Sequence, residues 1–300
     1  MEEERSKVGS PAIGPEPPGS VLSGRGFKIE DKGNLRDILL PLDSPNTLKG
    51  GIVNEFRRLF GHSSFRKTIR NITAGGGRAS LAKLREISGD DADRFVQFLV
   101  ELEVAEWSGN QVNLLRSLNN IGPTLEWYVA DLVQKQFGGS ADWSVKLADC
   151  AYGDYDVIGW LPPTLLYLEA KSARPSGIDD SELKNFLQRG VELAPELAIS
   201  LIDTDDDLEA TGSLDRIFNL MIPSVKLSSR ITDADWRPAK PFIAPAAGFP
   251  GISFGLFRYY VTNSEPSIEG QIRRCLRHYH TNVKGHTFYH GEPMNFVTDK

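Results

Sequence analysis

The 300-residue sequence has few cysteines, no long apolar run and no excess of positive charge, and each shortage excludes a class of protein. Its two cysteines, Cys150 and Cys275, are too few and too far apart for a disulfide scaffold, so the cytoplasm is the expected compartment. No apolar stretch reaches the roughly 18 residues of a membrane helix, and the first 20 residues lack the apolar core of a secretory signal. A net charge of −6 excludes a uniformly basic surface but allows a local basic patch.

What is present is an ordinary globular composition, with 40% apolar and 25% charged residues. This length allows one large domain or two smaller ones. Residues 1–20 are rich in proline, glycine and charge, which predicts a disordered tail. The patterns that follow divide the chain into a module over residues 21–120 and a second module over residues 121–300.

The first module shows a helical pattern followed by a hairpin pattern. Apolar residues recur at helical spacing from Ile52 to Ile72, and Ser80 can cap a second helix. Helices are expected over residues 52–74, 81–87 and 91–103, and strands over residues 104–107 and 111–115. The order helix, helix, turn, helix, hairpin resembles a winged helix-turn-helix, which implies binding to DNA or to protein.

Basic residues are concentrated in this module, where Glu55 is the single acid between residues 52 and 85. Such a face can contact nucleic-acid phosphates or can be a solvated helix surface. The helix over residues 91–103 is acidic and would be a poor guest in a major groove, so the module would bind DNA through its earlier helix or bind protein instead. The candidate nucleic-acid-binding residues are Arg57, Arg58, Arg66, Lys67 and Arg70, together with Arg273, Arg274 and Arg277 near the end of the chain.

The second module alternates helices and strands. Pro123 suits the first turn of a helix that runs to Phe137, with Leu125, Val129, Leu132 and Val133 as its buried stripe. Strands are expected over residues 143–147, 155–161, 165–172, 197–202 and 254–262, and helices over residues 180–193, 214–221 and 268–279. The core order α-β-β-β-α-β predicts an α/β domain with a mixed sheet.

Charged side chains lie on both strands of the hairpin expected over residues 155–172. Because side chains alternate along a strand, Glu169 and Lys171 share a face, and the Pro162-Pro163 turn brings Asp156 beside them. Two carboxylates at the end of an apolar hairpin are costly to desolvate unless a cation compensates. Mg²⁺ needs only one or two protein carboxylates, and the Ala170 carbonyl is a further candidate ligand. A solvated sheet edge with a surface ion pair is the alternative.

At these residues the chain resembles the PD-(D/E)XK nuclease superfamily, which has the restriction-endonuclease-like fold. Asp156, twelve intervening residues and Glu169-Ala170-Lys171 match the Asp and the Glu-X-Lys of that family on two paired strands. The resemblance covers roughly residues 120–265. The namesake proline of the family is absent, because Tyr155 precedes Asp156.

The resemblance implies a restriction-endonuclease-like αβββαβ core after a winged-helix-like module, and a metal-dependent endonuclease acting on DNA in restriction, repair or defence. Asp156 and Glu169 would hold Mg²⁺, for which Mn²⁺ could substitute, and Lys171 would orient or deprotonate the attacking water. Glu126, on the helix before the sheet, would assist through a metal-bound water. Asp154 is an alternative ligand, and Gln188 on the following helix is a supporting residue.

Two alternatives stay open: a non-catalytic DNA- or protein-binding regulator on a nuclease-like scaffold, and an enzyme acting on RNA. DNA is the expected partner, a homodimer or a partner protein is also open, and no membrane partner is expected. Four histidines near the C-terminus lie close to Cys275 at a spacing compatible with zinc, although no second cysteine pair supports such a site: His278, His280, His286 and His290.

Overall fold

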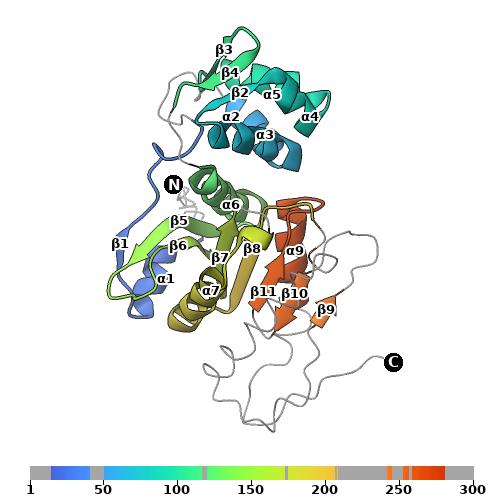
Figure 1. Cartoon of the computed structure of the whole chain (residues 1–300). Helices are drawn as coiled ribbons and strands as arrows, with labels where there is room; N and C mark the ends of the chain where they lie inside the picture. Colours follow the sequence, from blue (N-terminus) through green and yellow to red (C-terminus); the bar gives the residue numbers. More distant parts are fainter. Residues whose placement is uncertain are drawn as a thin grey trace, which may run out of the picture.

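The computed structural model describes residues 15–40, 51–116, 120–172, 175–206, 208, 242–244, 253–256 and 259–280. Over these ranges the chain forms a small unit with a three-stranded sheet and a larger unit around an eight-stranded mixed sheet (Figure 1). The α/β class and the mixed sheet are therefore confirmed. The helix expected over residues 214–221 and two of the histidines, His286 and His290, lie outside the described residues. No helix in the described ranges is both long and apolar enough to span a bilayer.

The small unit interleaves short strands with helices. Its elements are α2 (Ile52–Phe60), α3 (Ser63–Ala74), β2 (Arg78–Ser80), α4 (Leu81–Ser88), α5 (Asp91–Glu101), β3 (Ala105–Ser108) and β4 (Gln111–Leu114), with β4 between β2 and β3. The helix expected over residues 52–74 is broken at His62, whose backbone is extended. Strand β2 was not expected, because three residues are too few for an alternation to be seen. Ser80 caps α4 as expected, since its hydroxyl accepts a hydrogen bond from the Lys83 N–H.

The large sheet has the strand order β1-β5-β6-β7-β8-β11-β10-β9. Its strands are β1 (Ile29–Asp31), β5 (Ser140–Leu147), β6 (Tyr155–Leu161), β7 (Thr164–Lys171), β8 (Leu197–Ile202), β9 (Phe242–Ala244), β10 (Ser253–Leu256) and β11 (Tyr259–Thr262). Strands β7, β8 and β11 are parallel to one another, and the other neighbours are antiparallel. The predicted hairpin of β6 and β7 is confirmed.

Two features of this sheet differ from the sequence-based expectation. Strand β1 pairs with β5, and Leu22 of the preceding helix α1 (Pro18–Gly24) is buried against the same sheet. Residues 18–40 therefore contribute to the large unit. Residues 21–40 were expected in the first module, and residues 18–20, which begin α1, were expected in a disordered tail, so both predictions are wrong over these residues. The single strand expected over residues 254–262 is two strands, β10 and β11, which pair antiparallel.

Helices cover both faces of the sheet. On one face lie α6 (Gly122–Gln136) and α9 (Ile268–His278), and on the other lie α1 and α7 (Asp180–Leu193) (Figure 1). The predicted α6 stripe is buried, because Leu125, Val129 and Val133 are fully inaccessible and Leu132 is 5% exposed.

The hydrophobic core on the α6 face continues into the small unit. The ring centroids of Phe56 on α2 and Trp127 on α6 are 6.0 Å apart, and those of Phe60 and Tyr128 are 5.1 Å apart. Buried aromatic pairs of this kind add about 0.5–1.5 kcal/mol each beyond the area they bury. The small unit is therefore packed onto the large one rather than tethered to it.

Candidate active site

Charged residues gather where β6 begins and β7 ends. The antiparallel register pairs Val157 with Leu168, so the next residues outward, Asp156 and Glu169, are neighbours across the two strands. Asp156 Oδ2 accepts a hydrogen bond of 2.8 Å from the backbone N–H of Ala170. This contact holds the Asp156 carboxylate against the peptide that lies between Glu169 and Lys171.

Glu169 is almost completely buried, with 1% of its surface exposed, and is surrounded by donors. Lys171 Nζ lies 2.7 Å from Oε1, and Arg189 Nη1 donates to both carboxylate oxygens at 2.8 and 2.9 Å. The hydroxyl of Tyr167 donates to Oε2. A buried carboxylate is tolerated when charged donors surround it in this way.

Two further carboxyl groups have strongly shifted pKa values. Burial, and then repulsion from Glu169, raise the pKa of Glu126 to about 7, against the opposing effects of Lys171 and a hydrogen bond with Ser144. Burial, and then repulsion from Glu169 and Glu126, raise the pKa of Asp156 well above its usual value. Three carboxyl groups therefore share a region that holds two cations, Lys171 and Arg189.

Lys171 remains an ammonium at neutral pH. Burial acts to lower its pKa, but the attraction of Glu169 and Asp156 outweighs burial and raises it. The pKa of a lysine must be lowered towards 7 before the side chain can act as a general base at neutral pH. This arrangement therefore suits Lys171 to orienting water or offsetting negative charge, whereas deprotonating water would require a lowered pKa.

The two supporting residues have different positions from those expected. Asp154 is exposed in the loop before β6, where its charge contributes to the raised pKa of Glu126. Gln188 is exposed on α7, and the α7 side chain that reaches Glu169 is its neighbour Arg189. The helical pattern could have identified Arg189, since it lies three residues after the buried Phe186, whereas Gln188 lies off the buried stripe.

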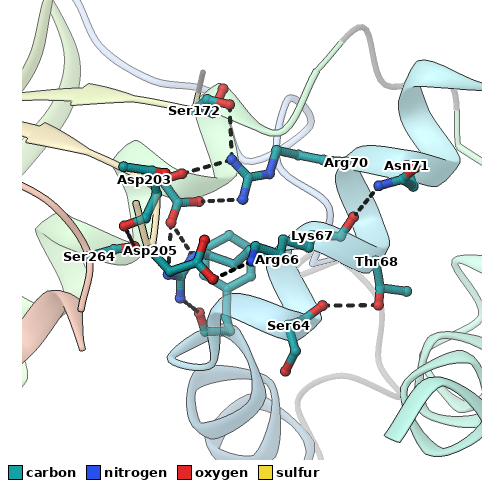
Figure 2. A network of polar contacts seen from close by, with 12 residues as sticks. Ser64, Arg66, Lys67, Thr68, Arg70, Asn71, Ser172, Asp203, Asp205 and Ser264 are labelled. Carbon is teal, nitrogen blue, oxygen red and sulfur yellow. Dashed lines mark hydrogen bonds and ion pairs between the residues drawn. The ribbon is translucent and has the colours of Figure 1, made fainter. Parts of the chain in front are cut away.

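The predicted phosphate-contacting residues of the small unit are largely engaged within the chain. Arg57 forms two hydrogen bonds of 2.7 Å with Asp131 on α6, and Arg58 pairs with Glu55. Lys67 pairs with Asp205 at 2.5 Å, and Arg70 donates to backbone carbonyls of the large unit (Figure 2).

Arg66 in particular cannot contact a phosphate. Its side chain is completely buried and pairs with Asp203 at 2.8 Å (Figure 2). The prediction is therefore wrong for this residue. A sequence shows a run of cations but not the distant acids that neutralise them.

The basic residues of α9 remain at the surface. Arg273 pairs with Glu269 at 2.7 Å and lies over the Phe137 ring, Arg274 is half-buried and donates to Gln271, and Arg277 is exposed. The nearby His278 bonds to the hydroxyl of Tyr260 at 2.8 Å, and burial lowers its pKa.

The donor chemistry at the hairpin fits Mg²⁺, which prefers carboxylate and carbonyl oxygens and keeps several waters. Over the residues that the structure describes, no group of three or more His, Cys, Asp and Glu side chains is arranged to hold a metal ion. A metal would therefore rest on Asp156, Glu169 and the carbonyl of Ala170. It would also have to compete with Lys171 and Arg189 for the oxygens of Glu169.

Comparisons with known proteins give no family for this chain. No family model matches it, and neither does any curated protein. A solved structure, that of protein VC1899 from Vibrio cholerae, is 14% identical with a TM-score of 0.36. The match covers 71% of this chain, and this chain spans 61% of the length of that one.

Proposed function

We propose that this chain is a metal-dependent nuclease that hydrolyses DNA phosphodiester bonds at the open end of the β6–β7 hairpin. The observation that carries the proposal is the contact of Asp156 with the Ala170 N–H, between Glu169 and Lys171 in the sequence. This contact supports the resemblance, in which the Asp and the Glu-X-Lys lie side by side on two paired strands. Glu126 adds a third carboxyl group, whose pKa is close to neutrality.

The order of the elements supports a restriction-endonuclease-like core and a winged helix. The run α6-β5-β6-β7-α7-β8 follows the order α-β-β-β-α-β, and its sheet is mixed. The run α3-β2-α4-α5-β3-β4, with its three-stranded antiparallel sheet, follows the order of a winged helix. The helix in the base-reading position, α5, begins with Asp91 and Asp93, so this module would not read a major groove through α5.

The side chains of the site would have separate roles. Mg²⁺ bound by Asp156, Glu169 and the Ala170 carbonyl would supply a Lewis acid that polarises a phosphoryl oxygen. Lys171, as an ammonium, would donate to a phosphate oxygen and offset the negative charge that grows there. Glu126, whose carboxyl group feels the charges of Glu169 and Lys171, would accept a proton from the attacking water.

One observation favours a second candidate, a non-catalytic scaffold. The oxygens of Glu169 already accept from Lys171 and Arg189. Two cations can satisfy a buried carboxylate permanently, in which case no metal would enter. The protein would then bind nucleic acid or protein without cleaving it.

A cleavage assay separates these candidates. Purified protein is incubated with plasmid DNA, single-stranded DNA and RNA in Mg²⁺, Mn²⁺, Ca²⁺ or EDTA. Cleavage should require Mg²⁺ or Mn²⁺, and Lys171→Ala should lower the rate by a factor of about 10² to 10⁴. Lys184→Ala, which removes an exposed lysine of α7, is the matched control and should cleave normally.

Two further arms sharpen the assay. Glu126→Gln should lower the cleavage rate if this group is the base, because a neutral amide cannot accept the proton of water. Cleavage of RNA but not DNA would change the substrate and keep the site. A wild-type protein that cleaves none of the three nucleic acids with any of the metals would favour the scaffold.

A further inference from the structure

Helix α3 of the small unit contacts the residues that directly follow β7 and β8, Ser172 and Asp203. Three of its basic side chains, Arg66, Lys67 and Arg70, point towards the segment that follows β8 (Figure 2). They contact Asp203 and Asp205 of that segment. Since Arg66 and Arg70 are four residues apart, they occupy one face of the helix.

Arg70 bridges the ends of the two strands. Its Nη1 donates to the carbonyl oxygen of Ser172 at 3.2 Å and to that of Asp203 at 2.8 Å, and its Nη2 lies 3.6 Å from the Asp203 carboxylate. Ser172 directly follows Lys171. One guanidinium therefore fixes the residues that come immediately after β7 and β8.

The same place holds the last hydrogen bond between these strands. The register runs to Lys171 opposite Ile202, and the N–H of Asp203 then donates to the carbonyl of Lys171 at 2.7 Å. Beyond this bond, Arg70 supplies donors where a continuing strand would have supplied them. The backbone of Lys171 is therefore held by its hydrogen bond with Asp203 and, one residue further on, by Arg70.

Arg66 pairs with the same residue, Asp203, inside the protein. It is completely buried, as is the Asp203 side chain, and its Nε donates to Asp203 Oδ1 at 2.9 Å. Arg70, by contrast, lines an open cleft of about 640 Å³ that is bordered by Asn71, Ser172 and Asp205. Its side chain can therefore be truncated without opening a cavity in the core.

We infer that Arg70 is a positioning residue, through which the small unit holds the end of β7 and so the ammonium of Lys171 in place. This inference rests on the proposed function for its catalytic consequence. Its structural consequence, order at Lys171, is independent of any activity. The small unit then has a structural role at the site, whether or not it also binds a partner.

The test compares full-length wild type with Arg70→Ala and Arg70→Lys. The control is Arg85→Ala, which removes an exposed arginine of the same unit that pairs with Asp93. Hydrogen exchange at the Asp203 amide measures how often its hydrogen bond to the Lys171 carbonyl opens. Steady-state cleavage measures kcat and KM. Arg70→Ala should speed that exchange at least about tenfold without changing exchange in β5. It should lower kcat by about ten- to a hundredfold and change KM less than twofold.

Arg70→Lys should recover part of both effects, since an ammonium can still donate to one of the two carbonyls. Unchanged exchange at Asp203 in Arg70→Ala would overturn the inference, and so would faster exchange with a normal kcat. If the wild type cleaves nothing but Arg70→Ala still loosens the end of β7, the structural role stands and the proposed function fails. If the wild type cleaves and Arg70→Ala matches it in kcat, the function stands and the inference fails.

Discussion

The buried ion pair of Arg66 and Asp203 makes the strongest prediction about stability. Both side chains are completely inaccessible, and Arg66 Nη2 lies 2.8 Å from Asp203 Oδ1. Asp203→Asn keeps the shape of the side chain but removes its charge. Arg66 would then be a buried cation with uncharged acceptors alone: the amide oxygen at position 203 and the carbonyls of Phe60 and Gly61, at 2.7 and 2.9 Å. Arg70, 3.6 Å from the same carboxylate, would add repulsion.

Breaking a buried pair by removing one partner costs about 3–5 kcal/mol. Because these uncharged oxygens still accept hydrogen bonds from Arg66, the expected loss is near the lower end, about 3 kcal/mol, or more than a hundredfold in the unfolding equilibrium constant. Urea unfolding followed by tryptophan fluorescence and circular dichroism measures this loss. Asp93→Asn, in the exposed pair with Arg85, is the control and should leave the midpoint unchanged.

The pH dependence of this contribution has a definite sign. Burial acts to raise the pKa of Asp203, but the attraction of Arg66 and Arg70 outweighs it and holds the pKa below its usual value of 3.8. The folded state then keeps the carboxylate ionised to a lower pH than the unfolded state does. Stability from this pair is present in full above about pH 4 and is lost as the pH falls further. If Asp203→Asn and Asp93→Asn unfold at the same urea concentration, the Arg66–Asp203 ion pair does not stabilise the fold as described.

Three further predictions concern Glu126, Arg57 and the metal. Because the pKa of Glu126 is raised, the folded state binds this proton more tightly than the unfolded state does. The stability of the wild type should therefore rise as the pH falls from about 7 towards 4.5. In urea unfolding at pH 8, Glu126→Gln should be more stable than the wild type by about 1–3 kcal/mol. Arg57→Ala should lower the free energy of unfolding by about 1–3 kcal/mol in the same assay, because it leaves the Asp131 carboxylate without its charged partner. It should leave the salt dependence of DNA binding unchanged in a fluorescence titration. Mg²⁺ at a hundred times its dissociation constant should stabilise the wild type by about 2.7 kcal/mol in thermal unfolding, and Glu169→Gln should lose that effect.

Much of the large unit could be predicted from the sequence. Strands β6 and β7 are strongly apolar, and the Pro162-Pro163 pair marks the turn between them, so their pairing and register follow. The buried stripe of α6 follows from its helical spacing in the same way. Elements without such periodicity were not predicted. Strands β1 and β2 have three residues each, and each pairs with a strand that is not its neighbour in the sequence, β1 with β5 and β2 with β4.

The candidate site could be predicted only in part. The grouping of Asp156 with Glu169 and Lys171 follows from side-chain alternation along two paired strands. Arg189 was not predicted, because the resemblance implies a Gln on this helix and Gln188 matches it, although the buried pattern of α7 favours the neighbouring position. The functions of Arg66 and Arg70 could not be predicted, because their partners Asp203 and Ser172 are more than a hundred residues away. Ion pairing across a fold depends on tertiary packing that local patterns do not contain.

A crystal structure of the full chain soaked in Mn²⁺ tests the central claim, that Asp156 and Glu169 hold a divalent metal beside Lys171. Mn²⁺ scatters anomalously and accepts the same oxygen ligands as Mg²⁺. The account predicts an anomalous peak between the two carboxylates, with Arg189 and Lys171 withdrawn from at least one oxygen of Glu169. Crystals saturated with Mn²⁺ that show no peak there, with Glu169 still bound to both cations, would contradict it.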